Sequence, residues 1–180
     1  MPAEKIFVSP KIDFSFKEMM KRQRAIRSFL SAVLGIPQEA MKEVRTSDPH
    51  LGKRYEQDKL SILDVRLVLN NRSEIDIEMQ VAPFPYWGNR SLYYNCRQFT
   101  DQAREGEGYK EFKQCIHISV LDFNLFSKGE NPSFHTSYHL REDKTGPVSY
   151  THLRIGALWR IKSSSWVVKS MELIYVSGKY

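Results

Sequence analysis

Apolar residues recur at helical spacing between residues 12 and 34, a pattern that predicts an amphipathic N-terminal helix. The apolar positions of this segment are Phe16, Met19, Met20, Ile26, Phe29, Leu30, Val33 and Leu34. Asp13 is a candidate N-cap, and Gly35 followed by Pro37 predicts the end of the helix. The polar side is basic, either a solvated surface or a contact for a phosphate backbone, and it carries Lys17, Lys21, Arg22, Arg24 and Arg27.

Two runs rich in branched aliphatic residues, 60–69 and 74–81, predict a β-hairpin around the polar residues 70–73. Strand alternation places the odd-numbered apolar residues of both runs on one face. The even-numbered polar residues then share the other face: Asp64, Arg66, Glu74, Asp76, Glu78 and Gln80.

The register of this hairpin decides which acids become neighbours. Residues directly opposite one another share a face, so their numbers must have an even sum. A sum of 142 places Asp64 opposite Glu78, and a sum of 144 places Asp64 opposite Gln80. Either register gathers Asp64, Glu78 and Gln80 into one patch.

The remaining segments complete an α/β chain with a mixed sheet. Residues 38–59 are polar, and residues 46–52 are typical of a loop. Residues 89–105 predict a helix that buries Leu92, Tyr93, Cys96 and Phe99 and carries Arg90, Tyr94, Arg97 and Arg104 on or beside its other faces. Residues 114–123 and 133–140 predict strands. Their histidines, which we expect at the surface, have no compact metal-ligand spacing: His117, His135 and His139.

Composition excludes several classes of protein. The chain has 180 residues, of which 41% are hydrophobic and 27% charged, as expected for one soluble globular domain. No apolar run approaches the ~20 residues of a membrane helix, and residues 1–10 contain no secretory signal. The two cysteines, Cys96 and Cys115, are too few for a disulfide framework or a four-thiolate zinc site.

The net charge of +6 indicates a polyanionic partner only weakly. Residues 147–180 contain five basic side chains and one acidic side chain, so they contribute +4 of this charge. Residues 1–146 therefore carry only +2. The signal for nucleic acid is local: the basic first helix, the arginines of residues 90–104 and the acid patch.

The acid patch has two chemical interpretations. In the structural one, Arg66 and a nearby lysine neutralise the acids on a solvated face. In the catalytic one, Asp64, Glu78 and a backbone carbonyl such as that of Met79 hold Mg²⁺, which prefers carboxylates and water. The metal would polarise a phosphodiester oxygen and acidify the attacking water. Gln80 could orient water or a phosphate oxygen but supplies no positive charge.

Asp64, then thirteen residues, then Glu78-Met79-Gln80, on two strands after an N-terminal helix, resembles the PD-(D/E)XK nuclease superfamily. Within it, the chain is most similar to the nuclease-family transposases, also called recombination-promoting nucleases. Further likeness lies in Asp13-Phe14-Ser15-Phe16-Lys17, in residues 29–34 and in residues 118–123. The order of these motifs is preserved across about residues 10–146.

The resemblance implies a restriction-endonuclease-like core and a cytoplasmic, Mg²⁺-dependent DNA endonuclease, with Mn²⁺ as a substitute. It makes Asp64 and Glu78 metal ligands, and it places Gln80 in the catalytic set where many members have lysine. Asp13 becomes an accessory acid. Candidate DNA contacts are Lys17, Lys21, Arg90, Tyr94 and Arg97. The partner would be DNA and not a membrane, and a homo-oligomer is compatible with the sequence. Two alternatives remain: a catalytically weakened DNA-binding accessory of recombination or transposition, and a protein-interaction module.

The last part of the chain carries a different expectation. Residues 147–153 read Pro-Val-Ser-Tyr-Thr-His-Leu, which looks like the translation of a transposon mosaic end used in sequencing-library preparation. We therefore expect a nuclease-like domain in residues 1–146 that lacks its natural end, and a non-homologous tail, an assembly artefact, in residues 147–180. The alternative is a genuine terminal hairpin with strands at residues 165–168 and 173–176.

Overall fold

The computed structural model describes residues 9–51, 56–57, 61–126 and 133–139, together with the backbone of residues 153–160. The α-helices are α1 (Asp13–Met20), α2 (Gln23–Leu34) and α3 (Trp87–Thr100), and the short 3₁₀ helices are η1 (Gln38–Ala40) and η2 (Tyr109–Glu111). The strands are β1 (Val44–Ser47), β2 (His50–Leu51), β3 (Ser61–Ile62), β4 (Val65–Leu69), β5 (Ser73–Gln80), β6 (Gln114–Leu121), β7 (His135–His139) and β8 (Leu153–Arg160).

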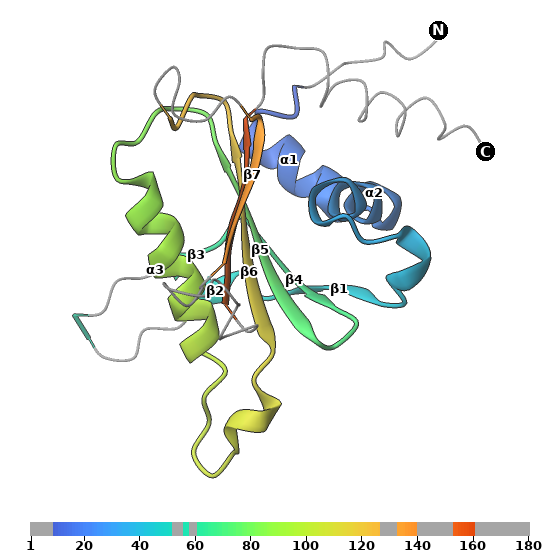
Figure 1. Ribbon diagram of the computed structural model, residues 1–180, viewed down its shortest axis with the longest axis vertical. Coiled ribbons are helices and arrows are strands. Elements are labelled where there is room, and N and C mark those ends of the chain that lie inside the picture. Colours follow the sequence, from blue (N-terminus) through green and yellow to red (C-terminus); the bar gives the residue numbers. More distant parts are fainter. Residues whose placement is uncertain (1–8, 52–55, 58–60, 127–132, 140–152, 161–180) are drawn as a thin grey trace, which may run out of the picture.

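A mixed six-stranded sheet with the order β1-β4-β5-β6-β8-β7 forms the centre of the fold. Strands β1, β4 and β5 are antiparallel, whereas β5, β6 and β8 run parallel, and β7 is antiparallel to β8. The pair α1 and α2 covers one face of the sheet and α3 covers the other (Figure 1). This confirms the expected α/β architecture with a mixed sheet.

The hydrophobic core lies between the sheet and the α1–α2 pair. It combines the odd-numbered residues of the hairpin with the even-numbered apolar residues of β6 and with Phe16, Met20, Ile26, Leu30 and Val33 from the helices. Gly35 ends α2 with a φ of 68°, a left-handed conformation that glycine adopts at no steric cost, as the sequence predicts.

The N-terminal segment is two helices rather than one. Arg22 has an extended backbone (φ −83°, ψ 120°) and separates α1 from α2. The sequence contains the signal, because the helical spacing of apolar residues is interrupted between Met20 and Ile26. Ile12, not Asp13, occupies the N-cap position of α1, and no side chain caps it. The expectation of an Asp13 cap is therefore wrong.

The central hairpin is confirmed with the first of the two registers. Val65 pairs with Ile77, Arg66 with Asp76 and Leu69 with Ser73. The turn contains Asn70 and Asn71, both at positive φ, which asparagine tolerates better than most residues. The first strand starts later than expected, at Val65, and residues 61–62 instead form β3 and pair with β2.

Strands β1 and β2 correct the expectation of a loop at residues 46–52. Val44–Ser47 pairs with β4 at the edge of the main sheet, and His50–Leu51 pairs with β3. Both strands are very short, and their polar residues give no alternating pattern long enough to predict a strand.

The expected buried stripe of α3 is wrong at Leu92 and Cys96, which are exposed, whereas its other two members, Tyr93 and Phe99, are partly buried. The fully buried positions of the helix include the polar residues Ser91, Asn95 and Gln98. The reason is that α3 packs over β6 and β8, on the sheet face where Glu78 and Ser119 are also buried. The helix therefore buries polar residues against a polar surface, although the Gln98 amide makes no hydrogen bond in the described part of the chain.

The backbone of β8 pairs with β6 and with β7. Its residues, 153–160, lie within the segment expected to be a non-homologous tail. The first six residues of the heptapeptide (147–152) and the alternative strands at residues 165–168 and 173–176 lie outside the described residues. The division at residue 146 stays a prediction.

Candidate active site

Two backbone hydrogen bonds bring Asp64 and Glu78 together on the face of the sheet covered by α3. Asp64 directly precedes β4, and its backbone N–H donates to Glu78 Oε1 at 3.0 Å. The backbone N–H of Met79 in β5 donates to Asp64 Oδ2 at 2.9 Å. The hairpin register therefore holds the two carboxylates as neighbours, which confirms the proximity that strand alternation predicts.

One oxygen of each acid faces a cationic side chain. Asp64 Oδ1 lies 3.4 Å from Lys17 Nζ of α1, and Glu78 Oε2 lies 3.5 Å from Arg90 Nη2 of α3. Lys17 also pairs with Asp13 at 2.8 Å. Asp13, expected as an accessory acid, therefore contacts Lys17 and not the acid pair itself. It lies at an exposed position at the start of α1.

Arg90 is held in place by aromatic rings. Its guanidinium lies 5.1 Å from the centre of the Trp87 ring and 5.2 Å from that of Tyr94, distances at which a cation is attracted to the ring face. Its Nε–H also donates to Tyr94 Oη at 3.1 Å. Tyr94, expected as a DNA contact, is largely buried and supports Arg90.

The other expected site residues lie apart from the acid pair. The Gln80 amide donates to the carbonyl of Ala82 at 2.9 Å and so bonds within its own loop. Lys21 pairs with Glu18 on the exposed side of α1. Arg97 lies about two helical turns beyond Arg90 on α3. The sequence therefore predicts that the two acids are neighbours, and of the expected cations Lys17 and Arg90 contact them.

The surroundings of the pair disfavour the state in which both carboxylates are ionised. Burial, followed by the negative charges of Asp76 and Asp64, raises the pKa of Glu78 to about 9, against the lowering effect of the Asp64 N–H and Arg90. Hydrogen bonding to Asp13 and the charge of Asp64 raise the pKa of Lys17. The site thus favours added positive charge, either a proton or a cation.

These contacts count against a merely solvated acidic face. Arg66 pairs with Glu74 at 2.8 Å and with Asp101 at 3.5 Å, not with the acid pair. Glu78 is only 2% exposed, so it is not a solvated surface acid. Of the two neutralising groups that the structural interpretation requires, only the lysine, Lys17, is found at the pair.

The donor set fits a magnesium ion. Mg²⁺ is usually held by one or two carboxylates, with water and phosphate oxygens completing its shell. Asp64 Oδ1 and Glu78 Oε2 accept none of the backbone hydrogen bonds that fix the two acids, and each faces a cation. Within the described ranges, no group of three His, Cys, Asp or Glu side chains could hold a metal, so further ligands would be carbonyl, water or substrate oxygens.

A buried polar chain behind the acid pair was not expected from the sequence. His117 Nδ1 lies 2.7 Å from Asp76 Oδ2, and His117 Nε2 lies 3.0 Å from Ser119 Oγ. The indole N–H of Trp87 donates to the same Ser119 oxygen at 2.9 Å. His117 is fully buried, so its expected surface position is wrong. The signal was available: Ile116, Ile118 and Val120 on the core face place His117 and Ser119 on the opposite face, with the acids.

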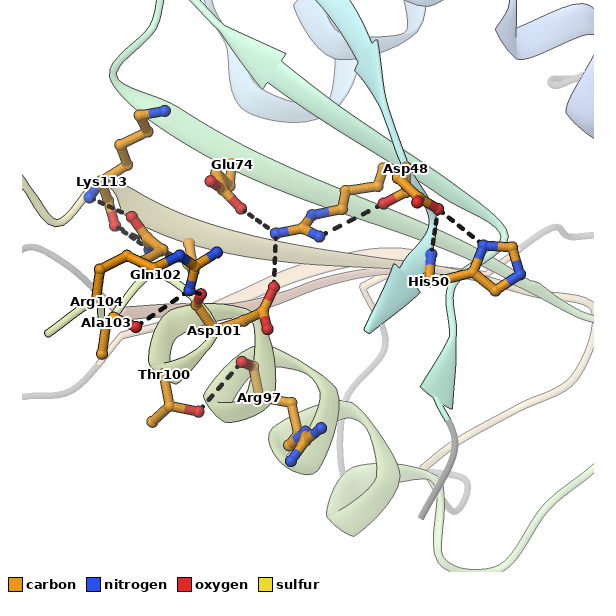
Figure 2. A network of polar contacts seen from close by, with 12 residues as sticks. Asp48, His50, Glu74, Arg97, Thr100, Asp101, Gln102, Ala103, Arg104 and Lys113 are labelled. Carbon is orange, nitrogen blue, oxygen red and sulfur yellow. Dashed lines mark hydrogen bonds and ion pairs between the residues drawn. The ribbon is translucent and has the colours of Figure 1, made fainter. Parts of the chain in front are cut away.

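A second polar network fixes the other end of α3. Asp101 and Glu74 meet at the guanidinium of Arg66, which also donates to the carbonyl of Asp48 at 3.4 Å (Figure 2). Gln102 exchanges two hydrogen bonds with the backbone of Lys113, at 2.7 and 3.1 Å. Both ends of α3 are therefore anchored to the sheet, which sets the position of Arg90 against Glu78.

Folding stability without divalent metal is expected to fall as the pH rises from about 4.5 toward 9. Folded Glu78 keeps its proton up to a pKa of about 9, whereas in the unfolded chain the carboxyl loses it near its ordinary pKa of 4.5. In this range the unfolded state binds fewer protons, so stability decreases by up to about 1.4 kcal/mol per pH unit. Urea unfolding in EDTA between about pH 5 and pH 8, with Glu78→Gln as the non-titrating control, measures this contribution. A difference between the two proteins that does not change with pH would contradict the raised pKa.

Comparisons with known proteins identify the family. Residues 10–158, more than half of the chain, match the family model described as PD-(D/E)XK nuclease family transposase. The comparison with curated proteins gave no match, and neither did the comparison with solved structures. In the part of the chain that the structure describes, no helix is long and apolar enough to span a membrane. The fold and the matched family model agree, and the chain belongs to the PD-(D/E)XK nuclease family transposases.

Proposed function

We propose that this protein is a divalent-metal-dependent DNA endonuclease that hydrolyses phosphodiester bonds at the Asp64–Glu78 pair. The observation that carries the proposal is that backbone N–H groups hold these two acids side by side, Asp64 N–H on Glu78 and Met79 N–H on Asp64, each acid with one oxygen turned toward a cationic group. Membership of a nuclease family supports DNA as the substrate. Mg²⁺ is the proposed ion and Mn²⁺ its substitute.

In this mechanism Asp64 and Glu78 would hold the ion, and the groups around them stabilise charge. When bound, a magnesium ion would polarise a phosphodiester oxygen and lower the pKa of the attacking water. The backbone N–H groups of Asp64 and Met79 orient the two carboxylates by direct hydrogen bonds. Arg90, held over the Trp87 and Tyr94 rings, is available to a DNA phosphate beside Glu78.

Lys17 supplies the positive charge that Gln80 lacks. Its ammonium group lies 3.4 Å from Asp64 although it comes from α1 rather than from β5. A cation beside the acid pair stabilises the negative charge that develops on the phosphate during hydrolysis. Gln80, bonded to Ala82, keeps the start of the following loop in position.

The proposal is tested with the full chain and a supercoiled plasmid. We expect nicked and linear products with Mg²⁺ or Mn²⁺, and no products when EDTA removes the ion. Cleavage that continues in EDTA would contradict a metal-dependent mechanism. The absence of cleavage with both metals would contradict the nuclease assignment.

One observation favours a second function, in which the protein binds DNA without cleaving it and serves as an accessory of recombination or transposition. The residue at position 80 is a glutamine whose amide bonds its own loop, so β5 provides no cation at the site. Binding that weakens steeply with salt, without cleavage in Mg²⁺ or Mn²⁺, would support this function instead.

A further inference from the structure

The loop that joins β5, which carries Glu78, to α3, which carries Arg90, exposes aromatic side chains. Tyr86 is 68% exposed and Phe84 is 38% exposed, and Val81 in the same loop is also exposed. The two rings pack edge to face, with their centres 6.1 Å apart and an interplanar angle of 77°. Exposed apolar groups that cluster in this way often mark a binding surface.

Hydrogen bonds hold this loop against the elements that carry Glu78 and Arg90. The Gln80 amide bonds the Ala82 carbonyl at the end of β5. On the other side, the N–H of Trp87 donates to the carbonyl of Phe84 at 3.1 Å, and the N–H of Arg90 donates to the carbonyl of Tyr86 at 3.0 Å. Tyr86 therefore lies one helical turn before Arg90, the residue whose guanidinium contacts Glu78.

The positive charges of Arg90 and Lys17 indicate which kind of ligand would cover these rings. Arg90 and Lys17 lie at the same acid pair and attract a phosphate backbone. A nucleic acid bound there offers its bases to nearby aromatic rings, and each base that stacks contributes to affinity whatever its sequence. In a closed duplex the bases already stack on one another, so exposed rings gain little from paired DNA.

We propose that Phe84 and Tyr86 stack an unpaired base next to the scissile phosphate, which makes single-stranded or locally unpaired DNA the preferred substrate class. This inference rests on the proposed nuclease function and assigns its substrate. A negatively supercoiled plasmid opens locally and should therefore be cut faster than the same plasmid once it is linear.

The test compares binding of a labelled single strand and a duplex of about 20 nucleotides by fluorescence anisotropy, in EDTA so that no strand is cut. We expect the double substitution Phe84→Ala and Tyr86→Ala to weaken single-strand binding roughly 5- to 100-fold, while duplex binding changes less than about twofold. Tyr86→Phe keeps the ring and should bind like the wild-type chain. Tyr109→Ala removes an exposed ring on η2 and should also leave binding unchanged.

Three results would overturn the inference. The double variant could bind the single strand as tightly as the wild-type chain, or it could lose single-strand and duplex binding equally. A change from dimer to monomer in sedimentation would instead assign the rings to a contact between two copies. Circular dichroism confirms that each variant is folded. Because binding is measured without metal, failure of the nuclease proposal, seen as no cleavage in Mg²⁺, is distinguishable from failure of this one.

Discussion

Replacing Glu78 by glutamine is expected to lower the rate of Mg²⁺-dependent DNA cleavage by about 10³-fold or more. The substitution removes one of two carboxylates proposed to hold the ion, and the loss of several kcal/mol of metal-based stabilisation corresponds to a factor of this size. The glutamine oxygen can still accept the Asp64 N–H that Glu78 Oε1 accepts at 3.0 Å, so the local geometry is retained. Initial rates of plasmid nicking measure the effect.

The Glu78→Gln substitution distinguishes loss of catalysis from loss of folding. Buried Glu78 is protonated at neutral pH without metal, because burial and neighbouring acids raise its pKa to about 9. Glu78→Gln should therefore be folded and no less stable than the wild-type chain in EDTA. Glu107→Gln changes an exposed acid and serves as the matched control. Cleavage by Glu78→Gln within about tenfold of the wild-type rate would contradict the proposed role of Glu78.

Removal of the imidazole in His117→Ala is expected to lower the free energy of unfolding by about 3–5 kcal/mol. His117 and Asp76 are both fully buried, and His117 Nδ1 lies 2.7 Å from Asp76 Oδ2. Alanine leaves the Asp76 carboxyl without this partner and removes the bond to Ser119, which Trp87 also contacts. Urea unfolding at neutral pH measures the loss.

A double-mutant cycle with Asp76→Asn tests whether the pair itself is responsible. Asparagine has nearly the same shape but no charge, so His117→Ala should cost less in this background, by about 1 kcal/mol or more. The same cost in both backgrounds would assign the effect to lost packing rather than to the pair. A loss below about 1 kcal/mol for His117→Ala alone would contradict a structural role for the buried chain.

The acid pair was predictable because it depends on a local rule. Side chains alternate along a strand, so the apolar pattern of residues 65, 67, 75 and 77 fixes the face of Asp64 and Glu78. The register did not need to be known. In contrast, the positions of Lys17 and Arg90 at the pair depend on how α1 and α3 pack on the sheet, which no local pattern specifies.

The failures of sequence reasoning have physical causes in the same packing. The buried face of α3 was misassigned because helical hydrophobicity assumes an apolar partner surface. Here the partner surface carries the buried polar residues Asp76, Glu78, His117 and Ser119, and the helix buries Ser91, Asn95 and Gln98 against the sheet. The strand Val44–Ser47 was missed because its place in the sheet comes from pairing with β4, not from its own four residues.

Titration calorimetry with Mn²⁺, on the full chain without DNA, tests most directly whether Asp64 and Glu78 bind a divalent metal ion together. We predict that the wild-type chain binds Mn²⁺ saturably and that Glu78 releases a proton on binding, because its pKa is about 9. We also predict that Asp64→Asn and Glu78→Gln each abolish Mn²⁺ binding. Unchanged Mn²⁺ binding in both variants, or no binding by the wild-type chain, would contradict the assignment of the metal site.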